Sequence, residues 1–146
     1  MLKGIDPVIS AELLMVLMSM GHGDDLLICD VNHPAAAIAK ETTYGRLVNV
    51  TGCHLPRAAE AILSLMPLDT FVPAPVMRMK VVDDPERIMP VQVRLQAVVD
   101  RMEGRTVAIQ ALERFDFYAA AKRAFAVVRT SDPGPYGCFI LRMGVV

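Results

Sequence analysis

The chain has 146 residues, 53% hydrophobic and 21% charged, with a formal net charge of −1. This length predicts one domain over residues 1–146, and the scattered Lys and Arg argue against binding to nucleic acid or to an anionic membrane surface. No apolar run reaches the roughly 18 residues of a membrane span, and the first ten residues lack the pattern of a secretory signal. The three cysteines are too widely spaced for a disulfide framework or a zinc ligand set. We therefore expect a cytoplasmic protein with reduced thiols.

The first predicted element is a helix over residues 11–20, with Ser10 as its cap. Its sequence, AELLMVLMSM, is apolar on nearly every side, which is typical of a helix that is buried or lies at a subunit interface. Because the whole chain is rich in apolar residues, we expect a homo-oligomer.

Short apolar runs and amphipathic segments alternate along the rest of the chain. The expected strands cover residues 25–29, 46–50, 76–82, 106–112, 125–130 and 138–143. The expected helices cover residues 55–66, 90–102 and 113–124. This alternation predicts an α/β sandwich with a largely parallel sheet.

The segment GHGDDLLICDVNHP (21–34) holds the first candidate site. Asp30 follows the first strand, at the edge where open α/β sheets bind ligands, and His22 precedes that strand on a loop made pliable by two glycines. If the loop folds back over the sheet edge, the two side chains share a pocket. Otherwise Asp30 caps a turn and His22 is a surface residue. His33, just before a proline, either lines the same pocket or faces water.

Two further segments carry candidate residues. In RFDFY (114–118), Arg114 and Tyr118 lie four residues apart on one helical face, and together suit a polyhydroxylated ligand; the alternative is a surface Arg stacked on a half-buried Tyr. In DPGPYGC (132–138), prolines and glycines stiffen a turn that presents Tyr136, Gly137 and Cys138. Such a turn suits hydroxyl binding, or is simply a hairpin. His54 suits a capping or loop role, and no pair of histidines has the spacing of a helical zinc motif.

Several blocks of the sequence resemble the L-fucose mutarotase family and its relative, D-ribose pyranase. They are the opening MLKGIDPVISAELLMVLMSMGHGD, the DVNHP after the first strand, RFDFYAAAKRAFAVVRT, and the closing PYGCFILRMGVV. The ribose pyranases carry a histidine at the position of Arg114 and lack the tyrosine at 118, so RFDFY looks like the fucose branch.

This resemblance implies a three-layer α/β sandwich assembled into a ring-shaped decamer, with each pocket near a subunit boundary. It implies that His22 is the catalytic histidine and that Tyr118 assists catalysis. It also implies that the sugar is bound by Asp30, Arg114, Tyr136, Gly137 and Cys138. The reaction implied is the interconversion of the α and β anomers of L-fucose or a similar monosaccharide, by acid–base ring opening and closure, with no cofactor and no metal.

Two departures from the family pattern bear on which sugar is bound. Cys138 stands where the family usually has asparagine, and Asn32–His33 stand where it more often has histidine followed by phenylalanine. Two alternatives remain: pyranose–furanose interconversion of the ribose pyranase type, and a non-catalytic sugar-binding or transport accessory protein.

Overall fold

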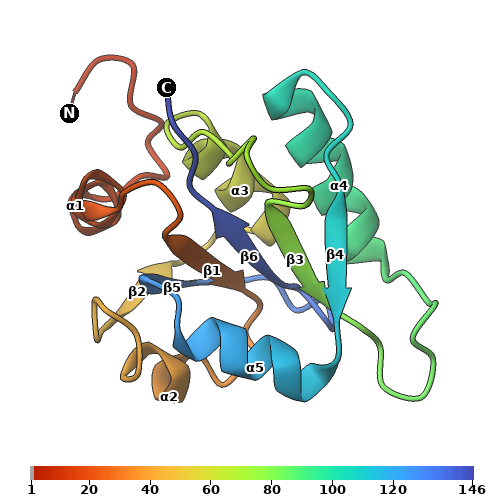
Figure 1. The fold of residues 1–146 in the computed structure, drawn as a ribbon. Coiled ribbons are helices and arrows are strands. Elements are labelled where there is room, and N and C mark those ends of the chain that lie inside the picture. Colours follow the sequence, from red (N-terminus) through yellow and green to blue (C-terminus); the bar gives the residue numbers. More distant parts are fainter. Residues whose placement is uncertain (1) are drawn as a thin grey trace.

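A six-stranded sheet runs through the middle of the molecule in the computed structural model, which describes residues 2–146 (Figure 1). The strands are β1 (Asp25–Cys29), β2 (Leu47–Val50), β3 (Val76–Met79), β4 (Ile109–Leu112), β5 (Ala126–Thr130) and β6 (Cys138–Arg142). Their order is β2-β5-β1-β6-β3-β4. β6 is antiparallel to both neighbours and every other pair is parallel. The predicted α/β class and largely parallel sheet are therefore confirmed.

β6 is reversed because the chain between β5 and β6 covers only residues 131–137. A connection between two parallel strands must run back along the length of a strand, and it needs a dozen or more residues. The short turn therefore places the end of β5 and the start of β6 at one edge of the sheet, which is also the edge where β1 ends.

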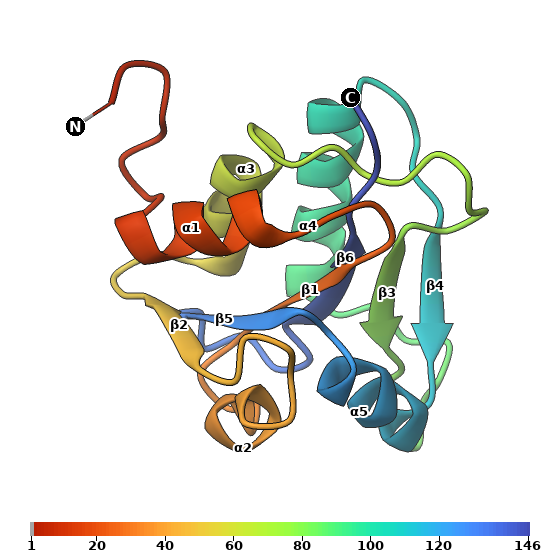
Figure 2. The same cartoon turned by 60° about the vertical axis from the view of Figure 1, so that its left-hand side comes forward.

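Five helices cover the two faces of the sheet and complete three layers (Figure 2). α1 (Ala11–Ser19), α3 (Leu55–Leu63) and α4 (Pro90–Glu103) lie on one face, whereas α2 (Ala35–Ala39) and α5 (Arg114–Lys122) lie on the other. Among residues 2–146, no helix has the length and apolar character needed to cross a membrane.

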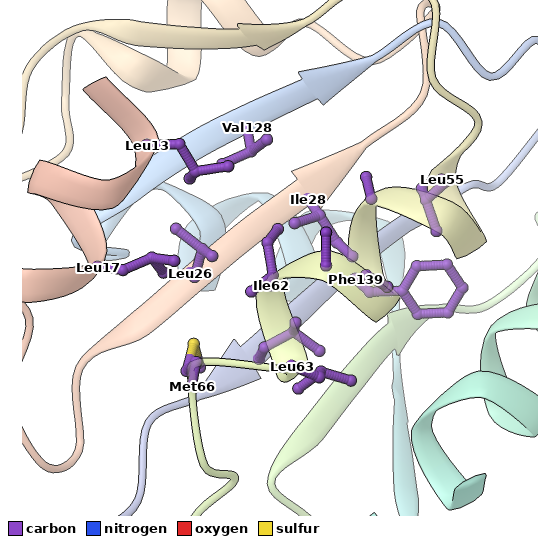
Figure 3. Close-up of a cluster of buried hydrophobic side chains, with 14 of the residues drawn as sticks. Leu13, Leu17, Leu26, Ile28, Leu55, Ile62, Leu63, Met66, Val128 and Phe139 are labelled. Carbon is purple, nitrogen blue, oxygen red and sulfur yellow. The ribbon is translucent and has the colours of Figure 1, made fainter. Parts of the chain in front are cut away.

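Alternation along the central strands fills both layers of the core. In β1, Leu26 and Ile28 pack towards α1 and α3 (Figure 3), whereas Leu27 and Cys29 pack towards α2 and α5. Successive side chains of a strand point to opposite faces, so a strand covered on both sides must be apolar throughout. This is why DLLIC reads as a continuous apolar run.

The helix ends confirm some expectations and correct one. The Ser10 hydroxyl accepts a hydrogen bond from the Leu13 N–H at 3.1 Å, so Ser10 caps α1 as predicted. His54 occupies the cap position of α3, but its side chain makes no capping bond there. The cap comes instead from Asp132, whose Oδ2 accepts from the Leu55 N–H at 3.0 Å. The short helix α2 was not predicted, because AAAIA carries neither a polar cap nor a clear periodicity.

Candidate functional site

A cavity of about 390 Å³ opens at the edge of the sheet where β1 and β3 end and β6 begins. Its lining comes from four elements and the loops beside them: Asp30, Asn32, His33, Met79, Val82, Arg114, Tyr118, Pro135, Tyr136 and Cys138. The volume lies in the range of small-molecule sites, and the position outside strand carboxyl ends is the usual one for ligands of α/β sheets. The cavity therefore brings together six residues that the sequence singled out: Asp30, His33, Arg114, Tyr118, Tyr136 and Cys138.

Asp30 is buried at the base of this cavity. Its Oδ1 accepts the backbone N–H groups of Asn32 at 2.8 Å and His33 at 3.0 Å. Burial raises the pKa of the Asp30 carboxyl, and these backbone hydrogen bonds oppose the shift. Asp30 thus caps the turn, as one of the two alternatives predicted, and it also lines the cavity.

Arg114 and Tyr118 both line the cavity from the first two turns of α5, as their i, i+4 spacing predicts. Burial raises the pKa of the Tyr118 phenol, which therefore stays protonated at neutral pH. Phe115 lies on another side of the helix, 74% exposed, with the Arg114 guanidinium 4.8 Å from its ring centroid.

At the turn before β6, the side chains or backbone of Tyr136, Gly137 and Cys138 make different contacts. Tyr136 has a positive φ of 59°, and its hydroxyl accepts a hydrogen bond from the Val82 N–H at 3.1 Å. Cys138 lines the cavity, and burial raises the pKa of its thiol far above the usual value, so it is no thiolate nucleophile. Gly137 lies behind Asp30: its carbonyl accepts the Asp30 N–H at 2.7 Å, and a Cβ there would lie 3.2 Å from the Asp30 Cβ.

His33 lines the cavity rather than facing water, which resolves the alternative left by the sequence. The residue is only 9% exposed, and its ring lies 5.5 Å from that of Tyr118 and 6.0 Å from that of Phe117. Burial lowers the pKa of His33 to about 4, so the imidazole is neutral at pH 7. Its Nε2 atom is shielded from solvent and has no hydrogen-bond partner.

His22 lies at the other end of β1, so within one protomer it does not share a pocket with Asp30. The five residues of β1 separate the two by about 16 Å of extended chain. The His22 Nε2 lies 3.2 Å from Oδ1 of the buried Asp69, and its ring stacks edge-on against Phe71 at 5.3 Å. The glycine-flanked loop does not fold back because the Gly23 N–H is bonded to the Met143 carbonyl at 2.9 Å.

Asp69 is a residue that the sequence did not identify. Its pKa is held below the usual value by the Phe71 N–H and by the imidazole of His22. Asp69 therefore orients the ring of His22. The partners are 47 positions apart in the sequence, and nothing in the sequence signals their pairing.

A larger recess of about 610 Å³ lies between the start of α1 and the end of β2. It contains Arg57 and His54, but Arg57 is already paired with Asp6 at 2.7 Å and His54 lies 3.7 Å from Asp132. No residue predicted as catalytic or sugar-binding lines it. The smaller cavity is thus the candidate site, with the volume of a small-molecule pocket and several polar side chains in its lining.

Comparison with known proteins gives the family. The sequence matches the RbsD / FucU transport protein family over residues 3–146, and the chain belongs to this family. It is 41% identical to the human fucose mutarotase over 99% of this chain and 94% of that protein. It is 37% identical to the L-fucose mutarotase of Haemophilus influenzae strain 86-028NP, over 99% and 97%. The predicted resemblance is confirmed.

Solved structures agree with this assignment. The Streptococcus pneumoniae fucose mutarotase in complex with L-fucose has a TM-score of 0.89 and 35% identity, covering 99% of each chain. FucU from Bifidobacterium longum gives a TM-score of 0.90 at 38% identity, covering 99% of each chain. Bacillus subtilis RbsD complexed with D-ribose gives 0.74 at 20% identity, covering 100% of this chain and 99% of that one, which shows the shared fold alone.

Proposed function

We propose that this protein is a mutarotase that interconverts the α and β anomers of L-fucose or a closely similar monosaccharide. The observation that carries the proposal is the cavity itself, which gathers Asp30, Arg114, Tyr118 and Tyr136 from distant parts of the chain. The fucose mutarotases to which the chain is 37% and 41% identical support the choice of sugar.

The reaction opens a cyclic hemiacetal and closes it on the other face. A base takes the proton of the anomeric hydroxyl while an acid protonates the ring oxygen, and the bond between the anomeric carbon and the ring oxygen breaks. After the aldehyde rotates, the same steps run in reverse. Only protons move, so two acid–base groups and a binding pocket suffice, each such group contributing roughly 10² to 10⁴ in rate.

Roles for the residues follow from their chemistry. Arg114 supplies fixed donors to the sugar hydroxyls, and Asp30 supplies acceptor oxygens. The protonated phenol of Tyr118 serves as acid. An imidazole can give and accept a proton near neutrality, which suits His22 to the role of base, oriented by Asp69 as a general base is by its carboxylate partner.

His22 can act in this way only if a second copy of the chain supplies it, and we propose that the site is shared between subunits of a ring-shaped homo-oligomer, most simply a decamer. Phe71 beside His22 is 71% exposed. An apolar recess of about 450 Å³, lined in part by Phe115, adjoins the candidate cavity at Tyr118. Docking the His22–Phe71 pair of one copy near this recess would cover both exposed rings and bring the imidazole to the sugar.

Saturation-transfer NMR between sugar anomers tests the activity directly. We expect the protein to accelerate exchange of L-fucose anomers well above the rate in buffer, and to act less on D-ribose because Arg114 and Tyr118 resemble the fucose branch of the family. Acceleration of pyranose–furanose exchange of D-ribose instead would support the pyranase alternative. Binding of fucose without acceleration would support a non-catalytic sugar-binding protein, the alternative that Cys138 leaves open.

A further inference from the structure

We propose that the imidazole of His33, which lines the cavity, turns its shielded Nε2 atom to one hydroxyl of the bound sugar and thereby rejects sugars that lack this hydroxyl. The inference rests on the proposed function, since it takes a monosaccharide as the occupant of the cavity. It adds a specificity-determining residue to the sugar-binding set of Asp30, Arg114 and Tyr136.

The main observation is a buried polar atom with nothing to bind. His33 is more than nine-tenths buried, yet its Nε2 has no hydrogen-bond partner. Leaving such an atom unsatisfied lowers the stability of the protein, and a phenyl ring of similar shape would avoid this cost. A histidine here therefore destabilises the empty protein, and a ligand in the cavity that His33 lines is the natural source of the missing partner.

The ring is held where a sugar would meet it. Its backbone N–H donates to Asp30 Oδ1 at 3.0 Å, and its ring is tilted against that of Tyr118 at 5.5 Å. Asp30 and Tyr118 are two of the groups that line the cavity. A ligand that touches both lies beside the imidazole, whose Nε2 atom is shielded in the empty protein and reaches the ligand when the ring turns.

The chemistry of the ligand group follows from the state of the ring. Burial keeps the imidazole neutral at pH 7, so it offers one donor and one acceptor. A hydroxyl, which can both donate and accept, satisfies such a ring without bringing a charge into the cavity. Cys138 lines the same cavity with a thiol that is a weak hydrogen-bonding group, so His33 supplies polarity that position 138 does not.

The test compares the affinities of a panel of sugars for the wild-type protein and for His33→Phe. The panel is L-fucose, L-galactose and the monodeoxy analogues of L-fucose, titrated by calorimetry. We expect one analogue to bind the wild type at least ten-fold more weakly than its hydroxylated counterpart, because a buried group left unpaired weakens binding strongly. In His33→Phe the same pair should bind within about two-fold of each other.

His33→Gln is the matched control, because the Gln amide places a donor and an acceptor near the position of Nε2; it should restore most of the discrimination. If the phenyl ring does not pack, His33→Leu removes the polar atom in its place. Equal affinity ratios across the panel in the wild type and the apolar variant would overturn the inference.

Anomer exchange measured on the same samples separates this inference from the proposed function. If the protein accelerates anomer exchange but the ratios of sugar affinities do not depend on His33, the mutarotase proposal stands and the proposed role of His33 is wrong. If discrimination between sugars depends on His33 but anomer exchange is not accelerated, the mutarotase proposal is wrong and His33 remains a sugar-binding residue. A wild type that binds none of the sugars would overturn both.

Discussion

Burial favours the uncharged form of three titratable groups that line the candidate cavity. It raises the pKa values of Asp30 and Tyr118 and lowers that of His33. Each shift favours the uncharged form, because the charged form is poorly solvated there. Apart from Arg114, the titratable groups of the cavity therefore suit a neutral ligand bound by hydrogen bonds, as a sugar is, better than a charged metabolite.

The change Tyr118→Phe removes the phenol hydroxyl and tests what its proton contributes to the reaction. The ring and its packing remain, so we expect binding of L-fucose to change by less than about three-fold, while anomer exchange slows by roughly 10²- to 10⁴-fold, the weight of one acid group. Saturation-transfer NMR and calorimetry on the variant give the two numbers. Exchange at the wild-type rate would remove Tyr118 from the chemistry.

His33 also makes the stability of the protein depend on pH. Its pKa in the folded protein, about 4, lies below the ordinary value of 6.5, so the unfolded chain takes up a proton first as the pH falls. The contribution is fully present above about pH 7 and is lost as the pH falls from about 6.5 towards 4, up to about 3 kcal/mol in all. The raised pKa of Asp30 acts with the opposite sign.

Comparing wild type with His33→Phe isolates this contribution, because the other titratable groups lining the cavity are common to both: Asp30, Arg114, Tyr118, Tyr136 and Cys138. Between pH 7.5 and pH 4.5 we expect urea denaturation at fixed protein concentration to show the variant losing about 2 kcal/mol less free energy of unfolding than the wild type. Equal losses would mean that His33 protonates as easily in the folded protein as in the unfolded chain.

Among the elements, the turn between β5 and β6 positions the edge of the sheet at the candidate cavity. Gly137 is in close contact with Asp30: a Cβ at 137 would lie 3.0 Å from the Gly134 carbonyl oxygen and 3.3 Å from Asp30 Oδ2. Gly137→Ala should therefore push Asp30 out of place, lowering stability by about 1 to 3 kcal/mol and weakening fucose binding.

The matched control is Gly104→Ala. A Cβ there meets nothing within 4 Å, and the backbone is in the left-handed region with φ 66°. That change should cost stability through backbone strain and leave fucose binding unchanged. Equal losses of binding in both variants would mean that Gly137 does not position Asp30.

The sequence predicted the layered architecture because local signals agreed with it: DLLIC is apolar on both faces of a covered strand, and Ser10 caps α1. It also predicted the Arg114–Tyr118 face, since that depends only on helical spacing. It could not predict contacts between distant segments. The pairing of His22 with Asp69, the cap that Asp132 gives α3 and the unpartnered Nε2 of His33 all depend on how separate loops meet.

At the scale of the whole molecule, large apolar side chains remain on the surface. They include Met18 on α1 at 79%, Phe71 at 71% and Phe115 at 74% exposure. Surfaces of this kind are typical of subunit interfaces. We expect light scattering at micromolar concentration to give a mass near ten times the 16.0 kDa of the chain. A mass near that of one chain would contradict the oligomer and, with it, the shared site.

The most direct test of the shared site mixes two inactive chains. His22→Ala should lower anomer exchange by roughly 10² or more, and a chain carrying both Arg114→Ala and Tyr118→Phe should bind and exchange fucose poorly. Co-expressed in equal amounts, the two should regain about a quarter of wild-type exchange, because in a ring with head-to-tail contacts one site in four combines an intact His22 with an intact cavity. Replacing the second chain by one that also carries His22→Ala should abolish the recovery. Exchange no higher than that of the two variants measured separately would contradict the proposal that His22 of one subunit serves the cavity of another.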